Sequence, residues 1–155
     1  YLFLKSFLNL KFNKETKFFC IDPNLEESKA NSLYLNAKNI TNNKSYIAPT
    51  YNNKEIIDKY LLEEINKFQP KYIIINLGGG TQERLALYIK KNCSYKVSIL
   101  CTGAAISFLT KKQAPINDLI DKLYLGWLVR TLYNPRKFLL RTIKSLSLIN
   151  LFLKN

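Results

Sequence analysis

The sequence predicts an α/β fold of three layers, in which helices cover both faces of a mostly parallel sheet. Two observations support this prediction. Short apolar runs without alternation, such as residues 71–76 (KYIIIN), have the pattern of strands that are buried on both faces. Segments with helical periodicity separate these runs, and this order favours parallel pairing in a Rossmann-like arrangement. A chain of 155 residues with 47% hydrophobic content is sufficient for such a globular domain.

Turn residues and helix caps delimit the elements expected before residue 71. In order, they are a strand at 17–21, a helix at 25–39, a loop at 41–44, a strand at 45–50 that Pro49 ends, and a helix at 53–68. Asn24 and Asn53 are expected to cap the two helices, because asparagine accepts hydrogen bonds from the free amides of a first turn. Asp22 begins the sequence DPN and is therefore assigned to a turn.

The helix expected at 53–68 has the clearest periodicity in the chain. Its apolar residues at helical spacing are Ile56, Tyr60, Leu61 and Ile65. We expect these four side chains to share one face of the helix.

The chain after residue 70 continues the alternation of strands and helices. It comprises a strand at 71–76, a helix at 81–92 and a strand at 95–101. Open parallel sheets bind ligands beyond the carboxyl ends of their strands. Residues 77–83 (LGGGTQE) and 101–105 (CTGAA) lie at such ends, so the ligand site is expected there and includes Gly103.

Three of the five glycines stand together as Gly78, Gly79 and Gly80, between an expected strand and an expected helix. Amides at a helix start can hold an anion, and glycine lets a phosphate approach closely. The spacing of the P-loop and dinucleotide motifs is absent, and a tight turn without a ligand is the alternative. Gln82 and Glu83 follow directly and can contact sugar hydroxyls, although Glu83 also suits the surface of a first helical turn.

The sequence changes character from Pro115 onward, which divides the chain into a core at 1–114 and a helical appendage at 115–155. No acidic residue follows Asp121. Four basic residues of the last expected helix fall within a sector of about 140° on a helical wheel, at about 100° per residue. They are Arg136, Lys137, Arg141 and Lys144. This pattern suits an anionic lipid interface, and a packing helix with a solvated basic side is the alternative.

Composition narrows the possible functions. With 24 Lys+Arg against 11 Asp+Glu, the net charge of +13 predicts an anionic partner. The absence of histidine excludes His-assisted nucleophiles and most transition-metal sites. The spacing of Cys20, Cys93 and Cys101 suits buried thiols in a reducing compartment. Asp118 and Asp121 fit helix-start charges better than a catalytic pair.

The beginning of the chain suggests a fragment. There is no methionine, the first residue is Tyr1, and we expect a missing segment before it. Residues 1–10 are apolar but too short and too polar to span a bilayer.

Four segments, in this order, resemble the WecG/TagA/CpsF family of glycosyltransferases. That family has a glycine turn before a P-x-Q-E element, a G-x-x-F-D-like loop, an R-A-P tripeptide and an L-E-W-x-x-R…P-R-R tail. The matching segments are 71–83 (KYIIINLGGGTQE), 97–109 (VSILCTGAAISFL), 113–115 (QAP) and 124–141 (YLGWLVRTLYNPRKFLLR). The likeness extends from about Ser45 to Arg141.

The resemblance implies transfer of an N-acetylhexosamine-type sugar from a UDP-sugar donor to a polyprenyl-diphosphate-linked acceptor, without a metal cofactor. The enzyme would act as a peripheral protein on the inner, cytoplasmic face of the cell membrane, in the synthesis of a polysaccharide or teichoic acid. Gln82 and Glu83 match the family's Q-E pair near the nucleotide. The C-terminal residues expected at the diphosphate and the membrane are Trp127, Arg130, Arg136, Lys137 and Arg141.

The sequence departs from the family pattern at several positions. Thr81 stands at the proline element, Gln113 replaces an arginine and Gly126 replaces a glutamate. Ser107 stands near the family's aspartate, which puts the role of that carboxylate in doubt. The catalytic aspartate of the family is expected upstream of Tyr1.

The alternatives to an active enzyme are an inactive truncated transferase and a basic α/β module that binds nucleic acid or membrane. The aromatic residues occur mainly in apolar runs, which disfavours nucleic acid as a partner. A homo-oligomer is compatible with the sequence.

Overall fold

The computed structural model describes residues 1–52, residues 55–110 and Leu132. The chain divides into two compact units, at 1–112 and 113–155, and the fold below is that of the first unit. The predicted appendage and its two helices lie outside the described residues.

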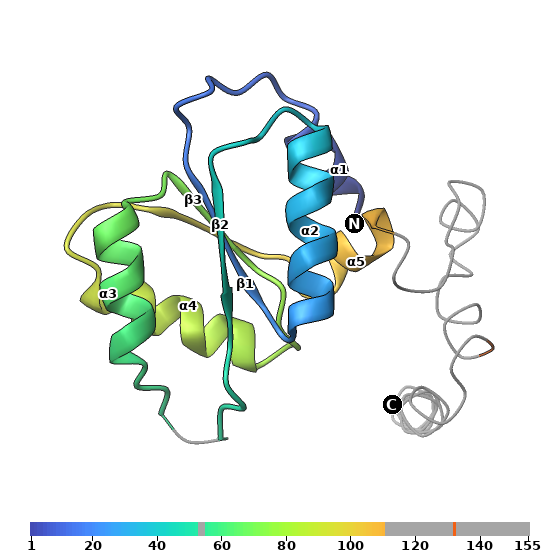
Figure 1. Ribbon diagram of the computed structural model, residues 1–155. Coiled ribbons are helices and arrows are strands. Elements are labelled where there is room, and N and C mark those ends of the chain that lie inside the picture. The colour runs from blue at the N-terminus through green and yellow to red at the C-terminus, as the bar shows by residue number, and fades with distance from the viewer. Residues whose placement is uncertain (53–54, 111–131, 133–155) are drawn as a thin grey trace, which may run out of the picture. The chain divides into compact units, whose positions relative to one another are not determined.

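The first unit contains a four-stranded sheet in which every neighbouring pair is parallel. The strands are β1 (Phe18–Asp22), β2 (Asn43–Ile47), β3 (Tyr72–Ile75) and β4 (Ser98–Cys101). Their spatial order is β2-β1-β3-β4, so the chain passes from one side of β1 to the other after β2 (Figure 1). Parallel neighbours require crossover connections, and the described helices supply them.

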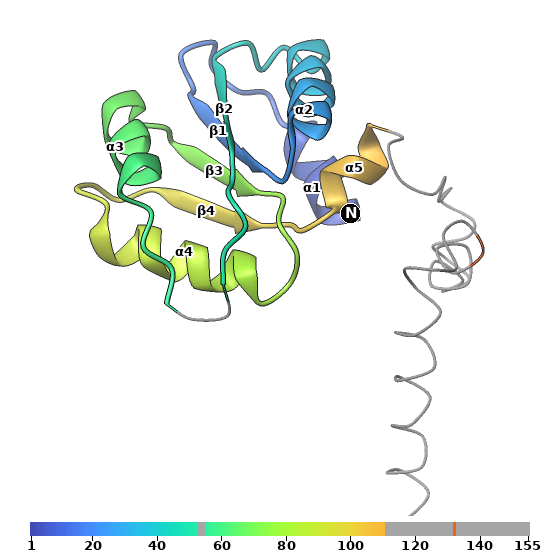
Figure 2. The same ribbon diagram turned by 60° about the horizontal axis from the view of Figure 1, so that its bottom comes forward.

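The helices lie on both faces of the sheet. They are α1 (Leu2–Leu8), α2 (Leu25–Ala37), α3 (Lys59–Phe68), α4 (Thr81–Asn92) and α5 (Ala105–Leu109). Helices α3 and α4 cover one face, and α1, α2 and α5 cover the other (Figure 2). The predicted three-layer, Rossmann-like α/β fold is therefore confirmed.

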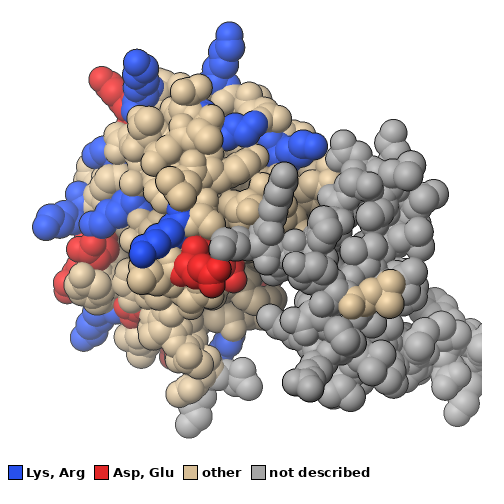
Figure 3. Space-filling model, turned by 45° about the vertical axis from the view of Figure 1, so that its right-hand side comes forward, with Lys and Arg blue, Asp and Glu red and all other residues tan. Residues whose placement is uncertain are grey.

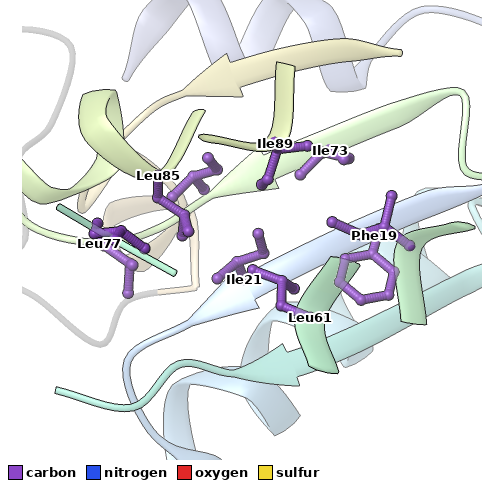
Figure 4. Packing of buried hydrophobic residues seen from close by; sticks show 10 residues of the cluster. Phe19, Ile21, Leu61, Ile73, Leu77, Leu85 and Ile89 are labelled. Atoms are coloured by element: carbon purple, nitrogen blue, oxygen red, sulfur yellow. The ribbon is translucent and has the colours of Figure 1, made fainter. Parts of the chain in front are cut away.

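Alternating side chains of β1 supply the core on each face. Phe19 and Ile21 pack with the apolar residues of α3 and α4, as Figure 4 shows. Phe18 and Cys20 belong to the cluster beneath α1, α2 and α5. All four side chains are buried. The continuous apolar run in β1 follows from this burial on both faces.

Helix α1 was not expected from the sequence. Its Leu4 and Leu8 are buried in the cluster with Ile74 and Ile106. The apolar residues near the N-terminus therefore contribute to the core of the first unit.

Three of the predicted elements begin two or more residues away from their predicted starts, including β4, which starts at Ser98 instead of residue 95. Helix α3 starts at Lys59 instead of residue 53, because Asp58 caps it and accepts a hydrogen bond from the amide of Leu61. Strand β2 starts at Asn43, inside the predicted loop, because it pairs with β1 from Phe18 onward.

The apolar face predicted for helix α3 also needs one correction. Ile56, Leu61 and Ile65 are buried, whereas Tyr60 is 64% exposed. Ile56 lies before the start of α3, so its position no longer sets the helical spacing.

Candidate functional site

The carboxyl ends of β1 and β3 lie at the point where the strand order of the sheet reverses. From β1 the chain goes outward to β2, and β3 then lies on the other side of β1. Ligands of open α/β sheets bind outside the strand ends at such a switch point. The loops after β1, β3 and β4 all leave from this edge of the sheet.

The glycine loop, defined here as Gly78, Gly79 and Gly80, connects β3 to α4. All three residues are exposed. Gly80 has φ +84°, which explains glycine at that position. A Cβ atom at Gly78 or Gly79 would meet no atom of the described residues within 4 Å, and neither residue has a positive φ. Neither packing nor backbone conformation therefore explains why residues 78 and 79 are glycines.

The first turn of α4 is joined to the loop after β4. The side-chain oxygen of Gln82 accepts a hydrogen bond from the amide of Gly103 at 2.7 Å. The side-chain nitrogen of Gln82 donates to Glu83 Oε1 at 2.8 Å, and Glu83 Oε2 accepts from the amide of Gly80. Gly103 has φ +55°, so this junction also depends on glycine.

These contacts define which backbone amides are available to a ligand. The amides of Gly80 and Gly103 are already engaged, by Glu83 and Gln82 respectively. Within the described part of the chain, the amides of Gly78 and Gly79 donate no hydrogen bond. The structure thus brings together six predicted site residues and leaves two exposed donors among them. Contact of Gln82 and Glu83 with a sugar stays a prediction.

A buried polar group lies beside this loop, at the ends of β1 and β3. Asp22 Oδ1 accepts hydrogen bonds from the side-chain amides of Asn31 and Asn76, each at 2.7 Å. Asn76 Oδ1 in turn accepts from the hydroxyl of Thr102 at 3.3 Å. The prediction of Asp22 as a turn residue is wrong, because Asp22 ends β1 and is fully buried.

Sequence reasoning missed this polar group. Asn76 and Thr102 each follow a strand directly, and that position was the available signal for them. Asn31 gave no such signal. Helix α2 buries Ser28, Asn31 and Leu35 on one face, so its inward side is polar near β1 and lacks an apolar repeat.

Two carboxyl groups at this edge have shifted pKa values, in opposite directions. Burial raises the pKa of Asp22, while the side chains of Asn76, Asn31 and Ser28 act against the increase. The hydrogen bond from Gln82 lowers the pKa of Glu83, and the amide of Gly80 acts in the same direction. The carboxylate of Glu83 is thus stabilised at the start of α4, where the helix dipole favours a negative charge.

Ser107, which stands near the family's aspartate, is buried in α5. Its hydroxyl donates to Glu27 Oε2 of α2 at 2.8 Å. In this chain the position therefore joins two helices.

The three cysteines are free thiols, but they differ in exposure. Cys20 is buried, Cys93 is partly buried and Cys101 is exposed. The prediction of buried thiols is confirmed for Cys20 and wrong for Cys101. Cys101 is the last residue of β4, and its side chain lies beside the backbone oxygen of Gln82.

A groove of about 930 Å³ lies between α4 and β4. Its lining includes Leu87, Lys90, Tyr95, Val97 and Ile99, and it reaches Glu83 and Cys101 at the carboxyl edge. The glycine loop does not line this groove. Among the residues that the structure describes, no group of three or more His, Cys, Asp or Glu side chains could hold a metal ion.

Basic side chains are spread over the visible face of the described part, with acidic side chains among them (Figure 3). The predicted diphosphate and membrane residues, Trp127, Arg130, Arg136, Lys137 and Arg141, lie outside the described residues. None of the described helices has the length and apolarity required to cross a membrane.

Comparison with protein families adds an independent result. The model of the glycosyl transferase WecG/TagA/CpsF family matches residues 18–155. This match starts at β1 and thus extends beyond the likeness expected from about Ser45 to Arg141. Comparisons with curated proteins and with solved structures found no match. The chain therefore belongs to the WecG/TagA/CpsF family of glycosyltransferases, whose activity serves cell-surface polysaccharide synthesis.

Proposed function

We propose that the chain transfers an N-acetylhexosamine-type sugar from a UDP-sugar to a polyprenyl-diphosphate-linked acceptor. The observation that carries this proposal is the open glycine loop at the carboxyl end of β3. Gly78 and Gly79 have room for a Cβ atom, no positive φ and exposed amides without a partner in the described part of the chain. Glycine at these two positions can still be explained by a ligand that approaches the backbone closely.

The ligand class follows from the chemistry of the loop. Backbone amides of exposed residues beside a helix start suit a phosphate oxygen, and the helix dipole adds to this attraction. The junction of Gln82 with Gly103 holds the loop after β4 beside α4, so both loops are fixed before a ligand arrives. Such preorganisation lowers the ordering cost of binding.

The C-terminal basic residues have a proposed role in the same reaction. As UDP leaves, negative charge develops on its β-phosphate, and guanidinium groups offer paired hydrogen bonds to it. We assign this role to Arg130 and Arg136, with Lys137 and Arg141 near the acceptor diphosphate or the membrane. No metal cofactor is part of the proposal, so a chelator is expected to leave the rate unchanged.

A transfer assay with the full-length protein, including any segment upstream of Tyr1, tests this function. UDP-N-acetylhexosamine and a polyprenyl-diphosphate-linked sugar are the substrates. Arg130→Ala and Arg136→Ala should each lower turnover by roughly 10²–10³-fold, the effect of removing a donor to a developing charge. Unchanged turnover in both variants, with normal folding by circular dichroism, would contradict the proposed role of Arg130 and Arg136 at the diphosphate.

Attachment to the inner face of the membrane has a separate test. Binding to anionic vesicles through the tail should partly survive high salt, because apolar insertion is not screened. Binding to an oligonucleotide should fall steeply with salt. Binding that is lost equally from both at high salt would favour the basic module over the membrane-associated enzyme.

A further inference from the structure

We propose that Asp22 is protonated in the folded protein and that its Oδ2–H donates a hydrogen bond to Asn31 Oδ1. The two side chains then form an acid–amide pair joined by two hydrogen bonds, at the ends of β1 and β3. This inference is independent of the proposed transferase reaction, and either can fail without the other.

The unpaired atoms of this buried group carry the argument. Asp22 Oδ1 accepts from two amides, but Asp22 Oδ2 is buried and has no hydrogen-bond partner among the described residues. Asn31 Oδ1 is also buried and finds no partner in that part of the chain. Both residues are fully inaccessible to solvent. Buried polar atoms are nearly always hydrogen-bonded, so two unpaired oxygens on interacting residues require an explanation.

One proton accounts for both oxygens. An ionised carboxylate only accepts hydrogen bonds, and an amide oxygen also only accepts, so these two atoms cannot satisfy each other. Protonation turns Asp22 Oδ2 into a donor. The unpaired acceptor belongs to the same Asn31 side chain whose nitrogen already holds Asp22 Oδ1. Turning the Asn31 amide over would let its nitrogen donate to Asp22 Oδ2, but it would place its oxygen against Asp22 Oδ1, so one buried acceptor would still lack a donor.

The surrounding charges favour the neutral acid. Helix α2 contributes Glu27, which raises the pKa of Asp22 in addition to the larger effect of burial. Strand β1 contributes the thiol of Cys20, whose own pKa is raised by burial and by Asp22. The side chains of Asn76, just after β3, and of Asn31 and Ser28 on α2 act in the opposite direction and lower this pKa, but burial is the largest effect. Helix α5 contributes Ser107, which donates to Glu27, and no basic residue is among the groups that shift this pKa.

Asp58 is the matched control, because it is a buried aspartate with the opposite pattern. Its Oδ2 accepts from the hydroxyls of Tyr46 and Tyr51, and its Oδ1 accepts from the amide of Leu61. Both carboxyl oxygens of Asp58 are thus supplied with donors, as an ionised group requires.

The test compares Asp22→Asn with Asp58→Asn by urea unfolding of the full 155-residue chain between pH 5 and pH 8. Asparagine at position 22 has the shape of the protonated acid and a permanent donor. We expect the Asp22→Asn midpoint to equal or exceed that of the unmodified protein at every pH, and the Asp58→Asn midpoint to fall. A raised pKa stabilises the protonated fold, so any pH dependence due to Asp22 must favour Asp22→Asn more as the pH rises. A loss of midpoint in Asp22→Asn comparable to that in Asp58→Asn would overturn the proposal.

A carboxyl-carbon NMR titration reads the proton directly. Asp22 should titrate above the range of exposed aspartates, and hydrogen exchange of the α2 amides at 31–35 should accelerate as Asp22 ionises. A titration below that range would overturn the proposal. A change in the urea midpoint of the unmodified protein when Mg²⁺ replaces Na⁺ would also overturn the proposal, because a cation would then hold Asp22 Oδ2 and Asn31 Oδ1.

Discussion

The two sides of the carboxyl edge differ in how their polar groups are used. On the side of β3 and β4, the glycine loop is exposed, and Gly78 and Gly79 offer amides that the described part of the chain does not use. On the side of β1 and α2, Asp22, Asn31 and Asn76 are buried, and both asparagines donate hydrogen bonds to Asp22. The first side has the properties of a ligand surface, and the second those of a support.

Asn76 connects the two sides. Its nitrogen holds Asp22, and its oxygen accepts from Thr102 at the start of the loop that carries Gly103. A change in the support can therefore alter the position of the ligand loops. The predictions that follow separate the two roles, in order of decreasing effect on stability.

Asn76→Ala should have the largest effect. It leaves the Thr102 hydroxyl without its acceptor, removes one of the two donors to Asp22 and opens a cavity at a site that is only 4% exposed. We expect a loss of about 3 kcal/mol in the free energy of unfolding, measured by urea denaturation. Asn92→Ala, at an exposed position, is the control and should stay within about 0.5 kcal/mol. Equal effects would show that Asn76 is not a support.

Gly103→Ala should have a smaller effect on stability. Its φ of +55° disfavours a side chain, at a cost of about 1–2 kcal/mol. The same substitution at Gly78, where φ is not positive and no atom is near, is the control and should cause no loss. The free energies of unfolding of the two variants provide the measurement. A similar loss at Gly78 would mean that the glycine loop is structurally constrained.

Glu83→Gln should have a small effect that depends on pH. The pKa of Glu83 is lowered, so its carboxylate stabilises the fold above the usual pKa of a glutamate, and this contribution is lost as the pH falls through the lowered value. The difference in urea midpoint between the variant and the unmodified protein should therefore shrink on acidification. Glu63→Gln, an exposed position on α3, is the control. A difference that is constant from pH 3 to pH 7 would contradict the assignment.

Much of the fold could be predicted from the sequence, because its signals are local. Apolar runs located the strands, and the range 81–92 predicted for one helix matches α4. Asn24 caps α2 as expected, accepting from the amide of Glu27. The start of α3 was missed because Asp58 caps the helix, and tertiary contacts of Asp58 with Tyr46 and Tyr51 favour that start. Asn53, the predicted cap, lies outside the described residues.

The candidate site was predictable in position but not in detail. The strand ends identified Gly78–Gly80 and Gly103, since loops at that edge are fixed by topology. The use of Gln82 and Glu83 to hold Gly103 and Gly80 depends on side-chain geometry across two loops. Asp22 was assigned to a turn because DPN is a turn sequence, whereas pairing with β2 and β3 keeps β1 extended up to that residue.

The most direct test of the account is a calorimetric titration of UDP into the unmodified chain and the Gly79→Ala variant. The added methyl group meets no atom in the described part of the chain, so the variant should be as stable as the unmodified chain or up to about 1 kcal/mol more stable. We predict that UDP binds the unmodified chain and that its affinity falls at least tenfold, or about 1.4 kcal/mol, in Gly79→Ala. Equal affinity of the two proteins for UDP would contradict the account, because the glycine loop would then not be where the nucleotide binds.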